Sequence, residues 1–197
     1  MSRPLFSPLV ERAVRFAAFK HDGHRRKASE LPYVSHLAAV ALVLAKAGLD
    51  DDAILAAALL HDVVEDTPCT PEELAAEFPA NVVAWVLALT ERKRDAAGEP
   101  RPWRDRKDEH LAHVAEAPWQ ARAIVLADKL HNLGSMVYDL DAGEELWGRF
   151  NAVREDILWY NRAMIAAGAG GDARLEPLAD ACREMLERVE GRLKVEG

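Results

Sequence analysis

The sequence predicts an all-α protein, a single-domain bundle of roughly eight to ten helices. Three observations favour this fold class. Apolar residues recur at helical spacing along most of the 197 residues. No stretch keeps the period-two alternation that is typical of a half-buried strand. Residues 53–60 form an unbroken apolar run, which is typical of a helix buried on all its sides.

The apolar periodicity places the helices in order along the chain. A short helix should begin after Thr70, with Glu73 at the capping-box position. We expect one domain over residues 1–197, with a core over about 9–167, a hinge at 168–171 and a C-terminal helix within about 172–195. The expected helices cover residues 9–20, 37–46, 53–67, 71–78, 80–93, 103–116, 120–137, 145–167 and 175–195.

Composition narrows the function classes. Half of the residues are apolar, which predicts a globular chain, and the formal net charge of -8 argues against nucleic acid or an acidic membrane as partner. No apolar run is long enough to span a bilayer, and the first residues do not form a signal peptide. The two cysteines, Cys69 and Cys182, have no metal-binding or redox spacing. We therefore expect a cytoplasmic protein.

Four polar residues follow the apolar run: His61, Asp62, Glu65 and Asp66. On a continuous helix their side chains would fall within about 140° of one face. Buried carboxylates without compensation cost several kcal/mol each. A divalent cation between these groups would remove that cost, so the pattern predicts a metal site.

Two residues elsewhere could complete such a site. His36 opens the expected helix at 37–46, and Asp128 interrupts an apolar segment. A lone histidine is more often a core residue than a ligand, but an aspartate in an apolar run is rarely buried without a partner. We do not expect Asp128 to pair with Lys129, because adjacent side chains on a helix diverge.

Two imidazoles and two carboxylates would leave positions open for water and substrate. Mixed nitrogen and oxygen ligands suit Mn²⁺ or Fe²⁺ and do not exclude Zn²⁺. Such a cation lowers the pKa of water. Glu65 and Asp66, one turn further on, could orient that water or accept its proton.

Two basic runs could bind phosphate. The first is Arg25, Arg26 and Lys27, in a loop over residues 21–32. The alternative is a solvated basic turn. The second run surrounds Lys93, and its flanking arginines could simply stabilise a helix C-terminus through the helix dipole.

The order of these motifs resembles a known family. FAAFKHDGHRRK is followed by PYVSH, AALLHDVVEDT, LTERK and LADKLHNL. The pattern H…HD…D is similar to the HD superfamily of metal-dependent phosphohydrolases, and the longer motifs resemble its RelA/SpoT-type branch of small alarmone hydrolases. The resemblance covers residues 14–137, most of the chain.

This resemblance implies an all-helical HD-type fold and one Mn²⁺ ion. It implies hydrolysis of the 3′-pyrophosphate of ppGpp and pppGpp to GDP or GTP and pyrophosphate. It implies Glu65 and Asp66 as the catalytic pair. The implied metal ligands are His36, His61, Asp62 and Asp128, and the implied substrate-binding residues are Arg25, Arg26, Lys27, Lys93, Lys129 and Asn132.

Some positions depart from the family pattern, among them Leu31, Leu37 and His131, where a tyrosine is frequent. We expect these changes to touch the nucleoside pocket and not the metal. They leave open another HD phosphohydrolase that acts on adenine alarmones, NADPH or nucleoside monophosphates. A nucleotide-sensing or antitoxin-like binding protein and a homodimer also stay open. The expected partner is a small-molecule nucleotide, with no nucleic acid and no membrane.

Overall fold

The computed structural model describes residues 4–26, 30–145, 147–149 and 152–193. Within them the chain forms ten α-helices and one 3₁₀ turn, and the residues described contain no strand, only isolated bridges between Arg25 and Pro32 and between Arg94 and Pro100. This confirms the predicted all-helical class. The helices are α1 (Pro8–Lys20), α2 (Val34–Lys46), α3 (Asp52–Leu60), α4 (Val63–Asp66), α5 (Pro71–Glu77), α6 (Ala80–Leu89), α7 (Trp103–Glu116), α8 (Trp119–Asp141), α9 (Arg154–Ala169) and α10 (Glu176–Leu193), and the 3₁₀ turn η1 covers Trp147–Arg149.

Helix α3 lies at the centre of the core. It contacts α1, α2, α6 and α8. Ala56, Ala57 and Leu60 are fully buried. A buried leucine side chain contributes roughly 1.5–3 kcal/mol. The apolar run is therefore largely buried, as its composition predicts, with Ala53 and Leu55 only partly covered.

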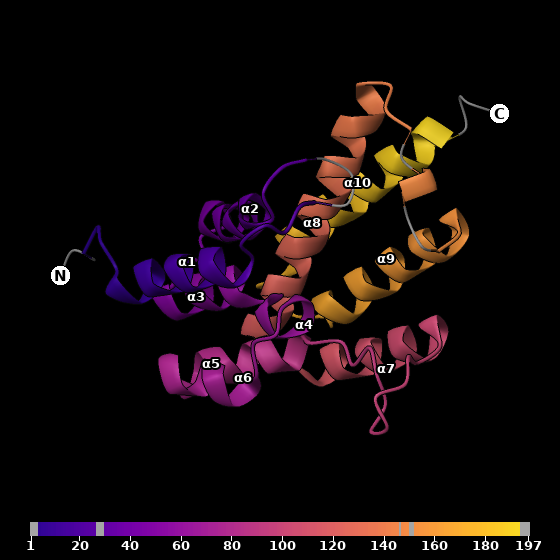
Figure 1. Cartoon of the computed structure of the whole chain (residues 1–197). Helices are drawn as coiled ribbons and strands as arrows, with labels where there is room; N and C mark the ends of the chain where they lie inside the picture. The colour runs from indigo at the N-terminus through magenta and orange to yellow at the C-terminus, as the bar shows by residue number, and fades with distance from the viewer. Residues whose placement is uncertain (1–3, 27–29, 146, 150–151, 194–197) are drawn as a thin grey trace.

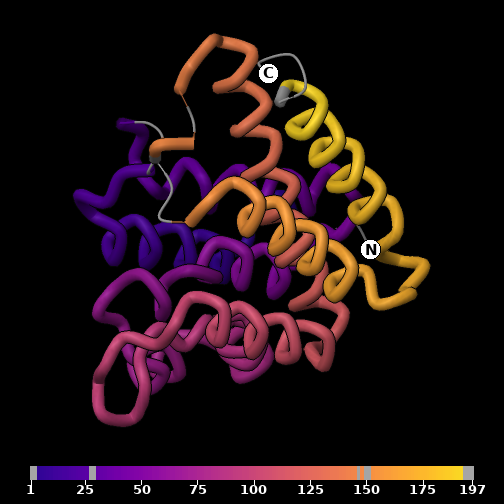
Figure 2. Tube along the Cα trace, turned by 90° about the vertical axis from the view of Figure 1, so that its right-hand side faces the viewer, coloured from indigo at the N-terminus to yellow at the C-terminus, as the bar shows by residue number. Residues whose placement is uncertain are grey.

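Helix α8 crosses the molecule and joins its parts (Figure 1). It contacts α2 and α3 on one side and α9 and α10 on the other. In the turned view, α9 and α10 follow one another as a helical pair, and α5, α6 and α7 form the lower part of the molecule (Figure 2). The middle of α8 therefore meets the beginning of α2 and the end of α3.

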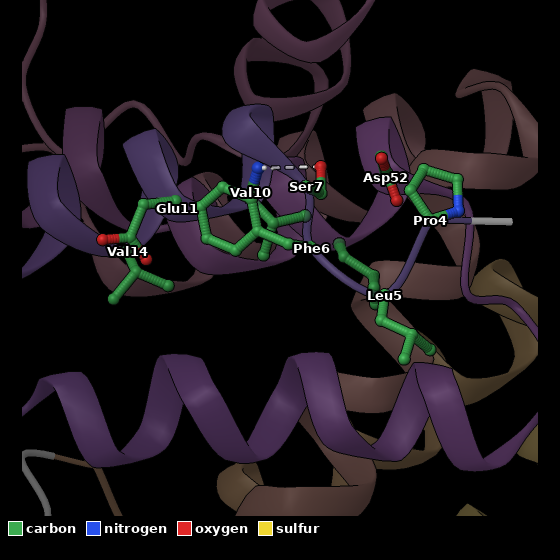
Figure 3. Close-up of a pocket in the computed structure, with 9 residues that line it drawn as sticks. Pro4, Leu5, Phe6, Ser7, Val10, Glu11, Val14 and Asp52 are labelled. Atoms are coloured by element: carbon green, nitrogen blue, oxygen red, sulfur yellow. Dashed lines mark hydrogen bonds between the residues drawn. The ribbon is translucent and has the colours of Figure 1, made fainter.

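Side-chain caps begin two of the predicted helices. Val10 donates its N–H to Ser7 Oγ at 3.3 Å at the start of α1, beside a hollow of about 260 Å³ (Figure 3). Glu73 donates its N–H to Thr70 Oγ1 at 3.2 Å, which confirms the predicted cap of α5. These caps satisfy backbone donors that have no partner within the helix.

The predicted continuous helix over 53–67 is wrong, because α3 ends at Leu60 and α4 begins at Val63. Asp62 has φ -100° and ψ -1°, away from regular helical values. The turn brings the Asp62 carboxylate back toward the His61 ring. Adjacent side chains on an unbroken helix would point apart.

Two other predicted boundaries also need correction. Helix α6 ends at Leu89 and not at Lys93, because Thr90 leaves helical geometry and the chain continues as an extended turn. Helix α9 begins only at Arg154, after an extended Val153, although a helix was predicted from residue 145. Residues 146 and 150–151 of that segment lie outside the described part. None of the described helices combines the length and the apolar character needed to cross a membrane.

Candidate active site

A cavity of about 980 Å³ opens between α2, the α3–α4 turn, α7, α8 and α9. It collects side chains that are up to 140 residues apart in the sequence, from His24 to Met164. Lys27 lies outside the described residues. The predicted site residues that line the cavity are Arg25, Arg26, His36, His61, Asp62, Glu65, Asp66, Lys93, Asp128, Lys129 and Asn132.

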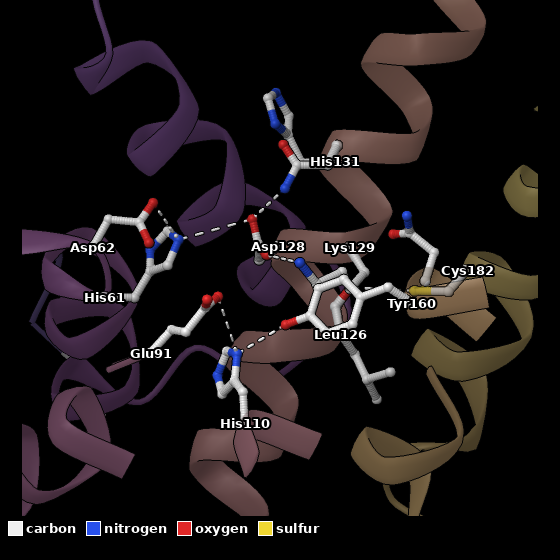
Figure 4. Close-up of polar contacts among 12 residues, drawn as sticks. His61, Asp62, Glu91, His110, Leu126, Asp128, Lys129, His131, Tyr160 and Cys182 are labelled. Atoms are coloured by element: carbon white, nitrogen blue, oxygen red, sulfur yellow. Dashed lines mark hydrogen bonds and ion pairs between the residues drawn. The ribbon is translucent and has the colours of Figure 1, made fainter. Parts of the chain in front are cut away.

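Three of the four predicted metal ligands form one compact group on the wall formed by α2, α3 and α8, and the fourth, Asp62, lies beside this group at the α3–α4 turn. His36, His61 and Asp128 each offer one ligand atom, and these atoms lie within 4.8 Å of one another. His36 Nε2 is 3.1 Å from Asp128 Oδ1. His61 Nε2 is 3.0 Å from Asp62 Oδ2, and Figure 4 shows this pair beside Asp128. The prediction that these side chains converge is thus consistent with the geometry.

The local chain orients His61 for metal binding. His61 caps the end of α3, and its Nδ1–H donates to the Ala58 carbonyl at 2.7 Å. Its Nε2 is therefore free for a ligand. That atom is buried and has no well-aligned hydrogen bond in the described part of the chain, although carboxylate oxygens of Asp62 and Asp128 lie 3.0 and 3.8 Å from it. A buried nitrogen of this kind fits a cation, because a buried polar atom otherwise carries an energetic cost.

Asp62 is held by a tyrosine that the sequence analysis did not single out. The Tyr33 hydroxyl donates to Asp62 Oδ2 at 2.6 Å and approaches Asp66 Oδ2 at 3.3 Å. The Tyr33 ring stacks on His21, with centroids 4.8 Å apart. Its position three residues before His36, within PYVSH, was the available signal.

Asp128 has two polar partners from its own helix. Asn132 Nδ2 donates to Asp128 Oδ1 at 2.6 Å. Lys129 Nζ lies 2.9 Å from Asp128 Oδ2, so the prediction that these neighbours do not pair is wrong. The long lysine side chain can fold back to the carboxylate, and the buried setting favours the pair because an unpaired ammonium there would be costly.

Burial and charge set the proton affinities of this cluster. Burial disfavours the His61 imidazolium, but Asp62 and Asp128 raise its pKa well above the ordinary value. Burial would raise the pKa of both carboxyls. The charge of His61 outweighs the effect of burial on Asp62, and the charge of Lys129 outweighs it on Asp128. The pKa of both carboxyls is therefore lowered. In the absence of a metal ion, the charges of the cluster therefore favour ionised carboxylates and a protonated His61.

The predicted catalytic carboxylates lie beside the metal wall. The Glu91 N–H donates to Glu65 Oε2 at 3.0 Å. Lys93 Nζ lies 2.5 Å from Asp66 Oδ1 and 3.1 Å from Glu65 Oε1. Burial and the charge of Asp62 raise the Glu65 pKa, while Lys93 opposes this rise. Lys93 was predicted to face phosphate, and in this structure it neutralises both carboxylates.

The wall formed by α7 and α9 carries polar groups that the sequence analysis missed. Lys107 Nζ lies 2.5 Å from Glu91 Oε2, and Arg106 lies 2.8 Å from Glu91 Oε1. His110 Nδ1 is 2.8 Å from the Tyr160 hydroxyl. Burial, and the charge of Lys129, lower the His110 pKa to about 4. The sequence signal for these groups was the spacing of Lys107 and His110, which are three residues apart and therefore share one face of the helix.

The basic loop reaches the metal wall through Arg26. Arg26 donates to Asn132 Oδ1 at 2.8 Å, and its guanidinium lies 5.9 Å from the centroid of the Tyr33 ring. Arg25 lines the cavity. Arg92, next to Lys93, pairs with Glu109 away from the cavity, whereas Lys93 lines the cavity.

His131 lies elsewhere than expected. Its Nδ1 is 2.8 Å from Nδ1 of His36, and the ring centroids are 4.9 Å apart. The expectation placed position 131 at the nucleoside pocket and away from the metal, whereas its ring contacts His36, one of the predicted ligands. The reason is the helical register, because residue 131 is almost one turn after Asp128 and faces α2.

An all-helical bundle that brings imidazoles and carboxylates together at one buried point defines a class of helical proteins that can hold a divalent metal ion. Comparison with known proteins agrees. The model of the HD domain family matches residues 13–146, and the chain belongs to that family.

Named relatives extend this result. The chain is 40% identical over 127 residues to guanosine-3′,5′-bis(diphosphate) 3′-pyrophosphohydrolase MESH1 of Xenopus tropicalis, a match that covers 64% of this chain and 68% of the relative. It is 34% identical over 177 residues to the Mus musculus protein of the same name, with 89% and 91% covered. A solved structure described as a metazoan ortholog of SpoT that hydrolyses ppGpp superimposes with a TM-score of 0.75 at 30% identity, covering 93% of this chain and 97% of that one.

Proposed function

We propose that the chain is a Mn²⁺-dependent enzyme that hydrolyses the 3′-pyrophosphate of ppGpp and pppGpp to GDP or GTP and pyrophosphate. The observation that carries this proposal is the cavity itself. One wall gathers the four candidate ligands, Glu65 and Asp66 lie beside them, and basic side chains come from three other segments. Relatives named for this reaction at 34–40% identity support the substrate class.

The charge balance of the cavity fits a substrate with several phosphates. Among the described residues, the acidic lining groups are Asp62, Glu65, Asp66, Glu91, Asp128 and Asp139, and the basic ones are Arg25, Arg26, Lys93, Arg106, Lys107 and Lys129. The numbers are equal, so a bound divalent cation makes the cavity positive within a chain of net charge -8. A positive cavity in an acidic protein attracts a polyanionic ligand.

His36, His61, Asp62 and Asp128 would hold the ion. Two imidazoles and two carboxylates suit Mn²⁺. When bound, the ion would lower the pKa of a water molecule and offset charge on a phosphate oxygen.

The chain itself would handle the protons. In the reaction a water oxygen forms a bond to the phosphorus on O3′, the P–O3′ bond breaks, and pyrophosphate leaves while O3′ takes a proton. Glu65 is suited to accept the proton of the water at Oε1, because its Oε2 is already held by the Glu91 N–H. Its raised pKa brings it closer to neutral pH, which favours proton transfer.

The basic groups would hold the phosphates by exchanging partners. Lys93 pairs with Glu65 and Asp66 in this structure, and Lys107 pairs with Glu91. A phosphate that reaches Lys93 would free the carboxylates for proton transfer. Arg26 and Arg25 would hold the other end of the nucleotide. Such charge-assisted hydrogen bonds are stronger than neutral ones.

The test is turnover of purified protein. The metal-depleted chain would be incubated with ppGpp and Mn²⁺, and the products separated by anion exchange. We expect GDP and pyrophosphate in equal amounts, no turnover with chelator, and no turnover for Asp62→Ala. Asp105→Ala, an exposed aspartate on α7, should behave as wild type.

Other outcomes would redirect the proposal. Turnover of adenine alarmones, NADPH or nucleoside monophosphates without turnover of ppGpp would show a different HD phosphohydrolase. Binding of ppGpp without any turnover, and biological function retained by Asp62→Ala, would indicate a nucleotide sensor.

We also propose that residues 1–197 act as one hydrolase domain in the cytoplasm. Helix α10 packs on α8 and α9, which joins the C-terminal helix to the site-bearing helix. Cys69 and Cys182 are free and buried, as in proteins of a reducing compartment. Removal of α10 should therefore reduce solubility, and cell fractionation should find the chain in the cytoplasm.

A further inference from the structure

The contact between His36 and His131 joins two imidazoles by one hydrogen bond. Their Nδ1 atoms are 2.8 Å apart, and the rings are tilted by 45°. His36 is buried, with 1% of its surface exposed. One nitrogen must donate and the other must accept, because two protonated nitrogens or two lone pairs would repel at this distance.

The role of His36 as a candidate metal ligand determines which of the two rings donates the hydrogen bond. His36 Nε2 points toward Asp128 Oδ1 at 3.1 Å and Asp62 Oδ2 at 3.7 Å, so Nε2 is the atom directed into the cluster. A ligating nitrogen needs its lone pair, which leaves the proton of a neutral ring on Nδ1. His36 then donates from Nδ1, and His131 accepts at its own Nδ1.

The two histidine ligands differ in where this support comes from. His61 follows a complete helix and uses the carbonyl of Ala58, three residues earlier. His36 is the third residue of α2 and has no full turn of helix before it. Its support must come from another element, and α8 supplies it three residues after Asp128.

We propose that His131 is a positioning residue of the metal centre: it fixes the tautomer and orientation of His36 and thereby strengthens metal binding. This inference rests on the proposed metal site and not on the identity of the nucleotide. Loss of such an outer partner of a ligating histidine typically weakens metal binding by about 10–100-fold.

Two variants of equal size separate hydrogen bonding from packing. His131→Asn keeps an acceptor oxygen close to the position of Nδ1, whereas His131→Leu has the same shape without an acceptor. Mn²⁺ affinity would be measured without substrate, from the electron paramagnetic resonance signal of free Mn²⁺. We expect about 10–100-fold weaker binding for His131→Leu and less than about threefold loss for His131→Asn. Circular dichroism and thermal melts of the metal-free proteins would confirm that both variants fold.

A second readout follows the proton directly. Nitrogen-15 spectra of the imidazoles in Zn²⁺-loaded protein should show His36 protonated at Nδ1, and this tautomer should become mixed in His131→Leu. Equal Mn²⁺ affinity in the two variants and wild type, or equal loss in both variants, would overturn the inference. Wild-type protein that binds Mn²⁺ but leaves ppGpp intact would contradict the proposed function and leave this inference standing. Wild-type protein that binds no divalent cation would overturn both.

Discussion

The two sides of the cavity are built differently. On the metal side, which is the wall formed by α2, α3 and α8, each candidate ligand contacts another group of the chain: Tyr33 for Asp62, Ala58 for His61, Asn132 for Asp128 and His131 for His36. On the side proposed to bind phosphate, which carries Arg26, Lys93 and Lys107, the cations contact carboxylates or amides of the protein itself. Lys93 and Arg26 are examples.

This difference indicates that the metal side is prepared before any substrate arrives. The phosphate side must exchange internal partners for phosphate oxygens, and that exchange has an electrostatic cost. Changes on the metal side should therefore abolish turnover, whereas changes on the phosphate side should shift affinity and pH dependence.

The largest effect should follow from Asp128→Asn, which removes a candidate ligand and leaves the mostly buried Lys129 ammonium without its carboxylate. We expect turnover to fall to background and the free energy of unfolding to fall by about 3–5 kcal/mol, because a buried ion pair is broken. Urea unfolding and the ppGpp assay measure the two effects. The double variant Asp128→Asn/Lys129→Met should regain stability without regaining activity. Recovery of activity in the double variant would show that Asp128 is no ligand.

Glu65→Gln should give the next largest effect. The amide keeps the size and the acceptor for the Glu91 N–H but cannot take a proton. We expect kcat to fall by about 10²–10⁴-fold, with Mn²⁺ affinity nearly unchanged. Steady-state kinetics would measure the fall in kcat, and a metal titration would measure the Mn²⁺ affinity. A loss of metal affinity that matched the loss of kcat would place Glu65 among the ligands instead.

Lys93→Met tests the phosphate side. Loss of a charged contact should raise KM for ppGpp by about 10–100-fold. Burial and Asp62 raise the Glu65 pKa and Lys93 opposes them, so without Lys93 this pKa should rise further. Glu65 must be ionised to act as a base, so the acidic limb of the pH–rate profile should move to higher pH. Lys20→Met, which breaks the exposed pair with Glu73, should change neither quantity.

The smallest effect is the pH dependence of metal binding. Burial opposes the His61 imidazolium, but Asp62 and Asp128 raise its pKa above 6.5 in the metal-free protein. The protonated His61 therefore stabilises the folded, metal-free protein fully below the pKa of an unfolded histidine. This stabilisation is lost as the pH rises through the raised pKa of His61. A metal ion displaces the proton, so Mn²⁺ affinity should increase by at most about tenfold per pH unit through that window. Calorimetry in buffers of different ionisation enthalpy would count the protons released. Constant affinity from pH 6.5 to 8 would mean that His61 binds no proton.

Much of the fold could be read from local pattern. The buried run at 53–60 predicted α3, and Thr70 with Glu73 predicted the start of α5. The prediction of a continuous helix through Asp62 was wrong because contacts of Asp62 with Tyr33 and His61 stabilise a turn there, and the apolar pattern gives no sign of this turn. The start of α9 was also misplaced, since helical spacing does not separate a 3₁₀ turn from a longer helix.

For the candidate site, the sequence by itself determined which groups are candidates for the chemistry. A histidine, a His-Asp pair and an aspartate within apolar helices stand out because buried polar groups need partners. Only the tertiary structure decided which groups support them. Tyr33, Glu91, Lys107 and His131 come to the site through the crossing of α8 with α2 and through the α7 wall. Such contacts depend on how helices that are far apart in the sequence pack against one another. Local apolar periodicity does not indicate which helices will pack together.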